Sequence, residues 1–186
     1  MGPLHWCFLS PLLGPWLTLR LLSLLLCLSF ALVLPVCAET LAPPLQGTVT
    51  WIYDGDTLKI DPIGKVRLIG IDTPERENSQ RDQYLIKQGI SAVRQRQIYQ
   101  RAKEFNIEQA KGHKVTLSLD DSPRDRYGRL LAYVHLPDGR LLNRVLLEQG
   151  LAVVYRRFPF RLKEDFLTAE AEAKKNRLGL WADHKL

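Results

Sequence analysis

The chain has 186 residues and a formal net charge of +6, from 26 Lys and Arg against 20 Asp and Glu. Its three cysteines, Cys7, Cys27 and Cys37, all lie within residues 1–38. The part after residue 38 is therefore neither a disulfide scaffold nor a thiolate metal site, and it has no cysteine nucleophile. The excess of basic residues favours a polyanionic partner, but it does not separate binding from catalysis.

Residues 1–38 have the pattern of a secretory signal peptide. They contain no acidic residue and a single basic one, Arg20, which precedes the apolar run Leu21–Leu34. Val36-Cys37-Ala38 has the small-x-small character of a signal peptidase site, so cleavage is expected before Glu39. The apolar run is also just long enough for an uncleaved membrane anchor. Both alternatives export the remainder, as a secreted or periplasmic protein or as a domain anchored outside the membrane.

A linker over residues 39–47 and a single domain over 48–186 are expected next. The stretch 49–76 contains three short apolar runs separated by two turn signals, Asp54-Gly55 and Asp61-Pro62-Ile63-Gly64. Asp-Gly and Pro/Gly-containing turns between strand-like runs are typical of antiparallel hairpins. The pattern predicts a three-stranded meander.

The rest of the domain alternates between helical and strand-like patterns. Residues 83–111 have no proline and carry apolar side chains at helical spacing, which predicts one long helix, or two with a break near Gly89 or Asn106. Further strands are expected over 113–119, 130–136 and 151–155, and helices over 141–149 and 161–176. The whole predicts an α+β fold, mainly a five-stranded OB-type Greek-key barrel with about three helices.

One basic residue, Arg67, lies in a run that otherwise reads as a buried strand, Val66–Ile71. A buried guanidinium is costly unless it is paired, and its planar fork suits carboxylates and phosphates. Asp56, Asp72 and Glu75 lie where the strands meet the turns. Two interpretations remain open at this point: a metal-assisted site for a phosphorylated substrate, or an internal Arg–Asp salt bridge at the end of a barrel.

Four segments in one order carry a resemblance to a known family. They are Asp54-Gly55-Asp56-Thr57, Val66–Glu75, Asp125-Arg126-Tyr127-Gly128-Arg129 and the closing run 169–181. Each segment is a modest signal, but the ordered set resembles the staphylococcal nuclease (thermonuclease) family over nearly all of 49–181. The helical region after Glu75 is longer than is usual in that family, which bears on substrate preference.

The resemblance implies roles for particular residues. Arg67 and Arg129 would hold the scissile phosphate, and Glu75 would act as the general base or orient the attacking water. Tyr127 resembles a residue near the nucleotide, and Tyr155 is a second candidate for the same pocket.

The resemblance also implies a Ca²⁺ cofactor. Its ligands would be the carboxylates of Asp56 and Asp72 and the backbone carbonyl of Thr73. Such a set suits a hard cation that accepts irregular oxygen geometry and several waters. The three histidines after residue 38 form no cluster in the sequence, which argues against zinc.

The function implied is an exported, monomeric Ca²⁺-dependent nuclease that hydrolyses DNA and RNA and leaves 3′-phosphates. No protein partner is implied, and a membrane is involved only if residues 1–38 are retained. Two alternatives stay open: a non-catalytic OB-fold module that binds nucleic acid, since such barrels often bind without cutting, and a membrane-anchored interaction domain that uses the basic helical region.

Overall fold

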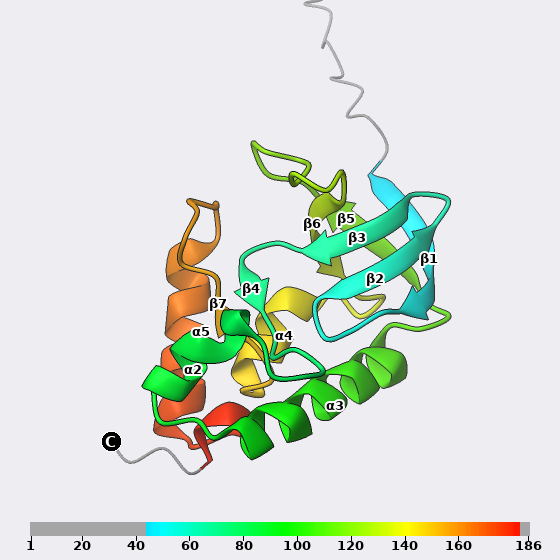
Figure 1. The fold of residues 1–186 in the computed structure, drawn as a ribbon. Coiled ribbons are helices and arrows are strands. Elements are labelled where there is room, and N and C mark those ends of the chain that lie inside the picture. Colours follow the sequence, from blue (N-terminus) through cyan, green and yellow to red (C-terminus); the bar gives the residue numbers. More distant parts are fainter. Residues whose placement is uncertain (1–43, 183–186) are drawn as a thin grey trace, which may run out of the picture. The chain divides into compact units, whose positions relative to one another are not determined.

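The computed structural model describes residues 44–182 (Figure 1). The expected signal peptide and most of the expected linker lie outside the described residues. The first strand begins at Leu45, earlier than the expected domain start at residue 48. No helix within the described residues has the length and apolar character needed to cross a bilayer.

Five strands close into a barrel in the order β1-β2-β3-β6-β5. The strands are β1 (Leu45–Ile52), β2 (Thr57–Asp61), β3 (Gly64–Leu68), β5 (Lys114–Ser118) and β6 (Leu130–His135). The first three form the expected antiparallel meander, and β3 pairs in parallel with β6 to close the barrel. The expected α+β fold with a five-stranded barrel is confirmed.

The strand expected over 151–155 lies outside this barrel. Its regular part, β7 (Val153–Val154), pairs with the two-residue β4 (Ile71–Asp72) in a separate small sheet. The expectation of a full-length strand there was wrong, because both residues of β7 are buried against helices and only β4 offers them a backbone partner.

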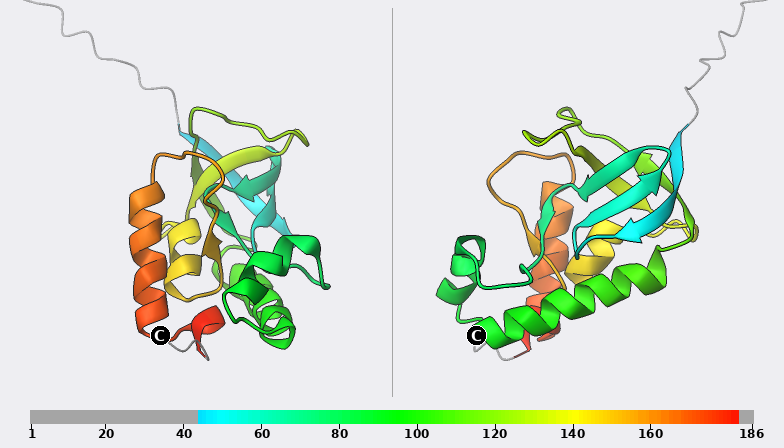
Figure 2. Two further views of the ribbon diagram at one scale, coloured as in Figure 1. Left: turned by 60° about the vertical axis from the view of Figure 1, so that its left-hand side comes forward. Right: turned by 45° about the vertical axis from the view of Figure 1, so that its right-hand side comes forward.

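The helical region after β4 is divided at Gly89. Of the two expected alternatives, one long helix or two helices with a break, the second is therefore confirmed. A 3₁₀ turn, η1 (Gln80–Asp82), leads into α2 (Gln83–Lys87), and α3 (Ala92–Gln109) follows after the break. Gly89 has φ of 81°, a left-handed conformation that glycine adopts without strain. The helix continues through Asn106 without interruption. Figure 2 shows α3 running along one end of the barrel.

Two further helices follow, so residues 44–182 contain four α-helices where about three were expected. They are α4 (Leu142–Glu148) and α5 (Lys163–Lys175), followed by the 3₁₀ turn η2 (Gly179–Trp181). The predicted apolar face of α5 is confirmed, since Phe166, Ala169 and Ala173 are all buried.

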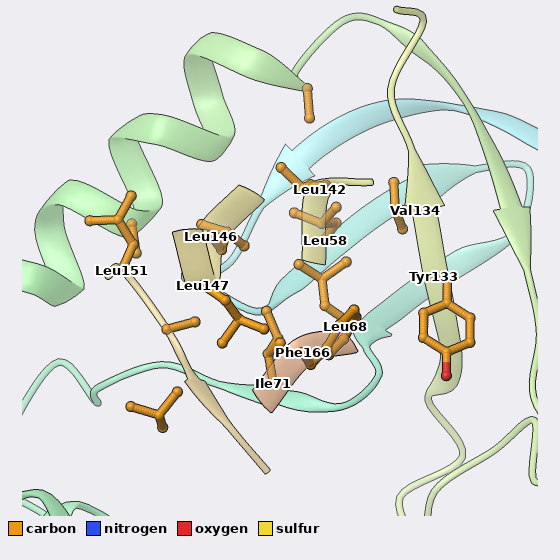
Figure 3. Close-up of a cluster of buried hydrophobic side chains, with 14 of the residues drawn as sticks. Leu58, Leu68, Ile71, Tyr133, Val134, Leu142, Leu146, Leu147, Leu151 and Phe166 are labelled. Atoms are coloured by element: carbon orange, nitrogen blue, oxygen red, sulfur yellow. The ribbon is translucent and has the colours of Figure 1, made fainter. Parts of the chain in front are cut away.

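The hydrophobic core joins the barrel interior to these helices (Figure 3). Leu58 and Leu68 from the barrel face Leu146 from α4 and Phe166 from α5. Complete burial of a Leu or Phe side chain contributes about 1.5–3 kcal/mol each. The core fixes β3 and β4, and these strands carry the polar residues described next.

The C-terminal turn η2 completes the core from the far side. Trp181 is fully buried, as expected for a residue that plugs the core. The turn approaches the end of α4 through two glycines: the Leu180 N–H donates to the Gly150 carbonyl at 2.9 Å, and a Cβ atom at Gly179 would lie 2.2 Å from that carbonyl. Any larger residue at Gly179 would therefore force the two segments apart.

Candidate active site

Arg67 lies between two buried aspartates on the outer side of β3. Val66 and Leu68 point into the barrel, so the alternation of the strand turns Arg67 outward. Its Nη1 donates to Asp56 Oδ1 and its Nη2 to Asp72 Oδ1, both at 2.6 Å. The internal Arg–Asp ion pair expected under one of the two interpretations is therefore present. It is compatible with the other, because a guanidinium has five N–H donors.

The loop that carries Asp56 is fixed by α3. The Nδ2 of Asn106, a fully buried residue of that helix, donates to the Gly55 carbonyl at 2.9 Å. Gly55 packs closely: a Cβ atom there would lie 2.8 Å from side-chain atoms of both Thr73 and Ala102. Glycine is thus required at Gly55 for space, and the close contact brings the loop against the strand end that carries Thr73.

The three expected calcium ligands lie together. The Thr73 N–H donates to Asp56 Oδ2 at 3.3 Å, while Asp56 and Asp72 share the guanidinium of Arg67. Asp56, Asp72 and Thr73 are each no more than 6% exposed. The three residues come from two segments, the loop between β1 and β2 and the end of β4, and these segments lie side by side.

Glu75 reaches this cluster through a second arginine. Arg81 Nη1 lies 2.5 Å from Glu75 Oε1, and its Nη2 lies 3.0 Å from Asp72 Oδ1. The guanidinium of Arg81 therefore bridges the expected general base and an expected metal ligand. Because the Arg81 side chain is 54% exposed, it can leave this position at a small energetic cost.

The backbone of Glu75 is held by Asp82. The Glu75 N–H donates to Asp82 Oδ1 at 3.2 Å, and Asp82 Oδ2 accepts from Arg96 Nη2 at 2.6 Å. Asp82 is only 3% exposed, so this contact is protected from water. The pair ties the loop of Glu75 to α3 through Arg96.

Arg129 is positioned by its own loop. Asp125 accepts the Arg129 N–H at 3.0 Å and its Nε–H at 2.7 Å. Arg67 pairs with Leu131 in the parallel β3–β6 ladder, and Arg129 comes immediately before β6. The two expected phosphate-binding arginines therefore come from neighbouring segments, Arg67 from β3 and Arg129 from the loop that leads into β6.

The two tyrosines occupy different positions. Tyr127 is 68% exposed in the loop before β6, with the guanidinium of Arg129 5.5 Å from its ring centre. Tyr155 follows β7 and lines a groove of about 400 Å³. The groove is also lined by Asp72, Arg81, Tyr84, Gln88, Val154, Arg156 and Arg157. Tyr155 is thus next to the expected metal ligands, in a groove with basic residues on its walls.

Burial and like charges dominate the electrostatics of the cluster. Burial raises the pKa of Asp72, and the charge of Asp56 raises it further, against the effect of Arg67 and Arg81. Burial and Asp56 likewise raise the pKa of Asp54 to about 6. Burial disfavours the charged form of Arg67, but Asp56 and Asp72 outweigh it and raise the pKa of that guanidinium. The cluster holds more negative charge than one guanidinium neutralises.

This donor set fits a hard divalent cation. Its atoms are oxygens of buried carboxylates and of a neighbouring backbone carbonyl, which is the chemistry that Ca²⁺ prefers. Within residues 44–182 no three His, Cys, Asp or Glu side chains group as a complete metal site. A bound cation would therefore need the Thr73 carbonyl and water among its ligands.

Three residues of this site were not predicted. Arg81, Asp82 and Asn106 lie in a stretch that reads as polar loop and solvated helix. Asn106 resembled a weak point of the helix, although its side chain holds the Asp56 loop. A signal was present in the helical spacing. Ala102 and Ala110 lie four residues before and after Asn106 and place it on an apolar face, where a polar side chain usually has a buried partner.

The barrel and the appended helices define an OB-like α+β domain with a buried acidic cluster around Arg67. The model of the family described as staphylococcal nuclease homologue matches residues 65–183. This match covers more than half of the chain, and the chain belongs to that family of nucleases. The resemblance based on the four ordered segments is confirmed.

Individual relatives agree with this assignment. A thermonuclease from Staphylococcus intermedius is 36% identical over 136 residues, which is 70% of this chain and 72% of that protein. The uncharacterized protein MJ1439 from Methanocaldococcus jannaschii is 36% identical over 148 residues, covering 73% of this chain and 70% of its own length. Endonuclease YhcR from Bacillus subtilis is 30% identical over 164 residues, but the match covers only 13% of that protein.

Proposed function

We propose that this chain is an exported, Ca²⁺-dependent nuclease that hydrolyses phosphodiester bonds in DNA and RNA. The observation that carries the proposal is the grouping of Asp56, Asp72 and Glu75 around two guanidinium groups, those of Arg67 and Arg81. A phosphodiester is an anion, and its hydrolysis adds negative charge in the transition state. A site of this kind needs arginines to bind that charge and a carboxylate to accept a proton.

Each side chain has a distinct task in the proposed reaction. Arg67, on β3, and Arg129, directly before the adjacent β6, donate to the non-bridging oxygens of the scissile phosphate. Glu75 accepts the proton of the attacking water. Asp56, Asp72 and the Thr73 carbonyl would hold the Ca²⁺ ion, whose charge, when bound, polarises the phosphate and neutralises developing negative charge.

Arg81 must leave Glu75 before the carboxylate can act as a base. A carboxylate that is paired with a guanidinium is a poorer proton acceptor, since the ion pair stabilises its charged form. An incoming phosphate offers Arg81 an alternative anionic partner. Tyr127 and Tyr155 are proposed to contact the nucleotides on either side of the phosphate.

A digest of fluorogenic DNA and RNA tests the proposal. Cleavage is expected in the millimolar range of Ca²⁺ typical of weak extracellular sites, with little in excess EGTA plus Mg²⁺. Glu75→Gln should abolish most of the turnover and leave the fold intact. End-group analysis should find 3′-phosphates. Full activity in EGTA with Mg²⁺ would contradict the calcium assignment, and nucleic-acid binding without any product would favour the non-catalytic module.

Export is proposed on the pattern of residues 1–38. Cleavage before Glu39 would release the domain as a monomer into the medium or the periplasm. N-terminal sequencing of the secreted material should begin at Glu39. Membrane-bound material with an intact N-terminus would support the anchor instead.

A further inference from the structure

The outer face of the meander carries two exposed aromatic side chains. A bulge in β1 between Val49 and Trp51 shifts the register, so that Trp51 faces outward while Ile52 stays in the core. Trp51 is 52% exposed and Tyr53 is 38% exposed. A tryptophan this exposed on a barrel strand loses the stabilisation that burial would give it, so its exposure calls for a functional reason.

These aromatics lie in the same rows as the candidate active site. Trp51 pairs with Lys59 across β1 and β2, and Lys59 pairs with Lys65 across β2 and β3. In the next row, the Tyr53 N–H donates to Thr57, and Thr57 pairs with Arg67. Neighbouring strands are about 4.8 Å apart and rows on one face about 7 Å apart. Trp51 and Arg67 therefore lie on the outer side of the meander, on β1 and β3, in neighbouring rows.

Each aromatic ring has a lysine beside it. Lys65 Nζ lies 4.4 Å from the ring centre of Tyr53, and Lys111 Nζ lies 5.4 Å from that of Trp51. Asp61 also lies on this face, with its Oδ1 3.5 Å from Lys59 Nζ. Three lysines against one aspartate leave the face positive, which suits a polyanion.

We propose that the outer face of β1, β2 and β3 binds the single-stranded nucleic acid that flanks the scissile phosphate. This meander face consists of Trp51, Tyr53, Lys59, Lys65 and Lys111. Unstacked bases lie on the two rings and the lysines pair with the phosphates between them, as in other proteins that bind single strands without sequence preference. A duplex keeps its bases stacked on one another, so the rings discriminate against it. The inference rests on the nuclease proposed above and assigns it a preferred substrate form.

Binding in EGTA separates this face from catalysis. Trp51 and Trp181 are the tryptophans after residue 38, and Trp181 is buried. An unstructured oligonucleotide of about 20 nucleotides should therefore quench Trp51 fluorescence, whereas a duplex of the same length should not. Trp51→Ala should weaken single-strand binding about tenfold, and Trp51→Phe should restore most of it. Lys65→Gln should lower the salt dependence of binding by about 0.7 in log–log slope.

Kinetics on substrates of two lengths complete the test. Trp51→Ala should lower kcat/KM on the long single strand about tenfold and leave a dinucleotide within about twofold, since a dinucleotide held at Arg67 is too short to reach Trp51, two strands away. Val93→Ala and Lys175→Gln, exposed positions at the far end of α3 and on α5, serve as controls and should change neither substrate. Melting curves verify that every variant is folded.

Failure of the meander-face proposal and failure of the nuclease proposal give different results. Equal loss on both substrates, equal weakening of single-strand and duplex binding, or no change in Trp51→Ala would overturn the meander face as a single-strand site. A wild-type protein that cleaves neither substrate in Ca²⁺ would contradict the nuclease proposal. In that case the binding measurement in EGTA still decides whether the meander face holds single strands.

Discussion

Arg81 and Glu75 form an ion pair, with 2.5 Å between Nη1 and Oε1. The same guanidinium contacts Asp72 at 3.0 Å, so one cation occupies the space between the proposed base and a proposed metal ligand. Burial opposes its charged form, but Asp72 and Glu75 raise the pKa of Arg81. The contact holds Glu75 and Asp72 close to one another, and it would compete with the proposed metal ion for Asp72.

Removal of this guanidinium should make Ca²⁺ binding tighter. Arg81→Gln leaves Asp72 with Arg67 alone, so the cluster has a greater need for another cation. The Ca²⁺ concentration that gives half of the rise in Tm should fall by about fivefold, a modest effect because Arg81 is half exposed. Arg76→Gln, an exposed arginine in the same loop, is the control. An unchanged Ca²⁺ midpoint in Arg81→Gln would show that the two cations do not compete.

The two proposed phosphate-binding arginines should differ in their effect on stability. Lysine keeps the charge but loses the planar fork, so Arg67→Lys cannot reach Asp56 and Asp72 together. Arg67→Lys should lower the Tm by several degrees, whereas Arg129→Lys, whose main partner Asp125 lies in a surface loop, should lower it less.

Both substitutions should also slow catalysis. Loss of one charge-assisted contact in the transition state is worth about 3–4 kcal/mol, or a few hundredfold in kcat. Single-turnover cleavage and melting curves on the same samples give both quantities. A folded Arg67→Lys protein that cleaves within about twofold of wild type would make Arg67 a purely structural residue.

Asp82 should act on the reaction through Glu75. Asp82→Asn replaces a carboxylate that accepts from the Glu75 N–H and from Arg96, so the backbone of Glu75 becomes less well fixed. A displacement of the proposed base by about 1 Å can lower kcat by up to a hundredfold. We expect a fall of about tenfold or more in kcat with little change in KM. Glu77→Gln, exposed in the same loop, should change neither, and a pure rise in KM in Asp82→Asn would contradict the positioning role.

Glu170 should give the fold a dependence on acidic pH. Burial alone would raise its pKa, but hydrogen bonds from Arg156 and from the Val154 N–H, together with the charge of Lys174, lower the pKa of this carboxyl. A carboxyl with a lowered pKa in the folded state stabilises the protein above its unfolded pKa, near 4.5, and loses this contribution as the pH falls.

Melting curves of Glu170→Gln and wild type across pH 3–7 test this contribution. At pH 7 the variant should be less stable by roughly 1–3 kcal/mol. The difference should narrow as the pH falls below about 4.5, because protonated Glu170 resembles glutamine. Glu172→Gln, on the exposed side of α5, should follow wild type throughout. A difference that stays constant with pH would mean that the charge of Glu170 does not contribute.

The barrel was predictable because its signals are local. Asp54-Gly55 and the 61–64 turn fix the meander within a short stretch of chain, and Phe166 and its neighbours show the helical period directly. The pairing of Val153 with Asp72 is not local, since it depends on which backbone groups remain after the barrel has closed. For the same reason, the apolar run at 151–155 indicated a buried segment but did not indicate which strand this segment pairs with.

The residues of the candidate site also fall into two groups, those that the local sequence predicts and those that it does not. The ordered motifs around Asp56, Arg67 and Asp72 could be recognised from their residue types and their order. Arg81 and Asp82 lie in a polar loop, and nothing in their immediate sequence distinguishes a solvated side chain from one that spans two carboxylates. Their roles depend on how η1 lies against β4, which only the folded chain defines.

The C-terminal turn sets a condition on when the protein can fold. Trp181 fills the core after every other element, and the contact between Gly150 and Gly179 seats it there. The ribosome makes the chain from its N-terminus, so a growing chain lacks this plug until residue 181 has been added. Until then the parts of α3 and α5 against which η2 packs lack this cover. The hydrophobic core that fixes β3 and β4 is therefore complete only after residue 181 has been added.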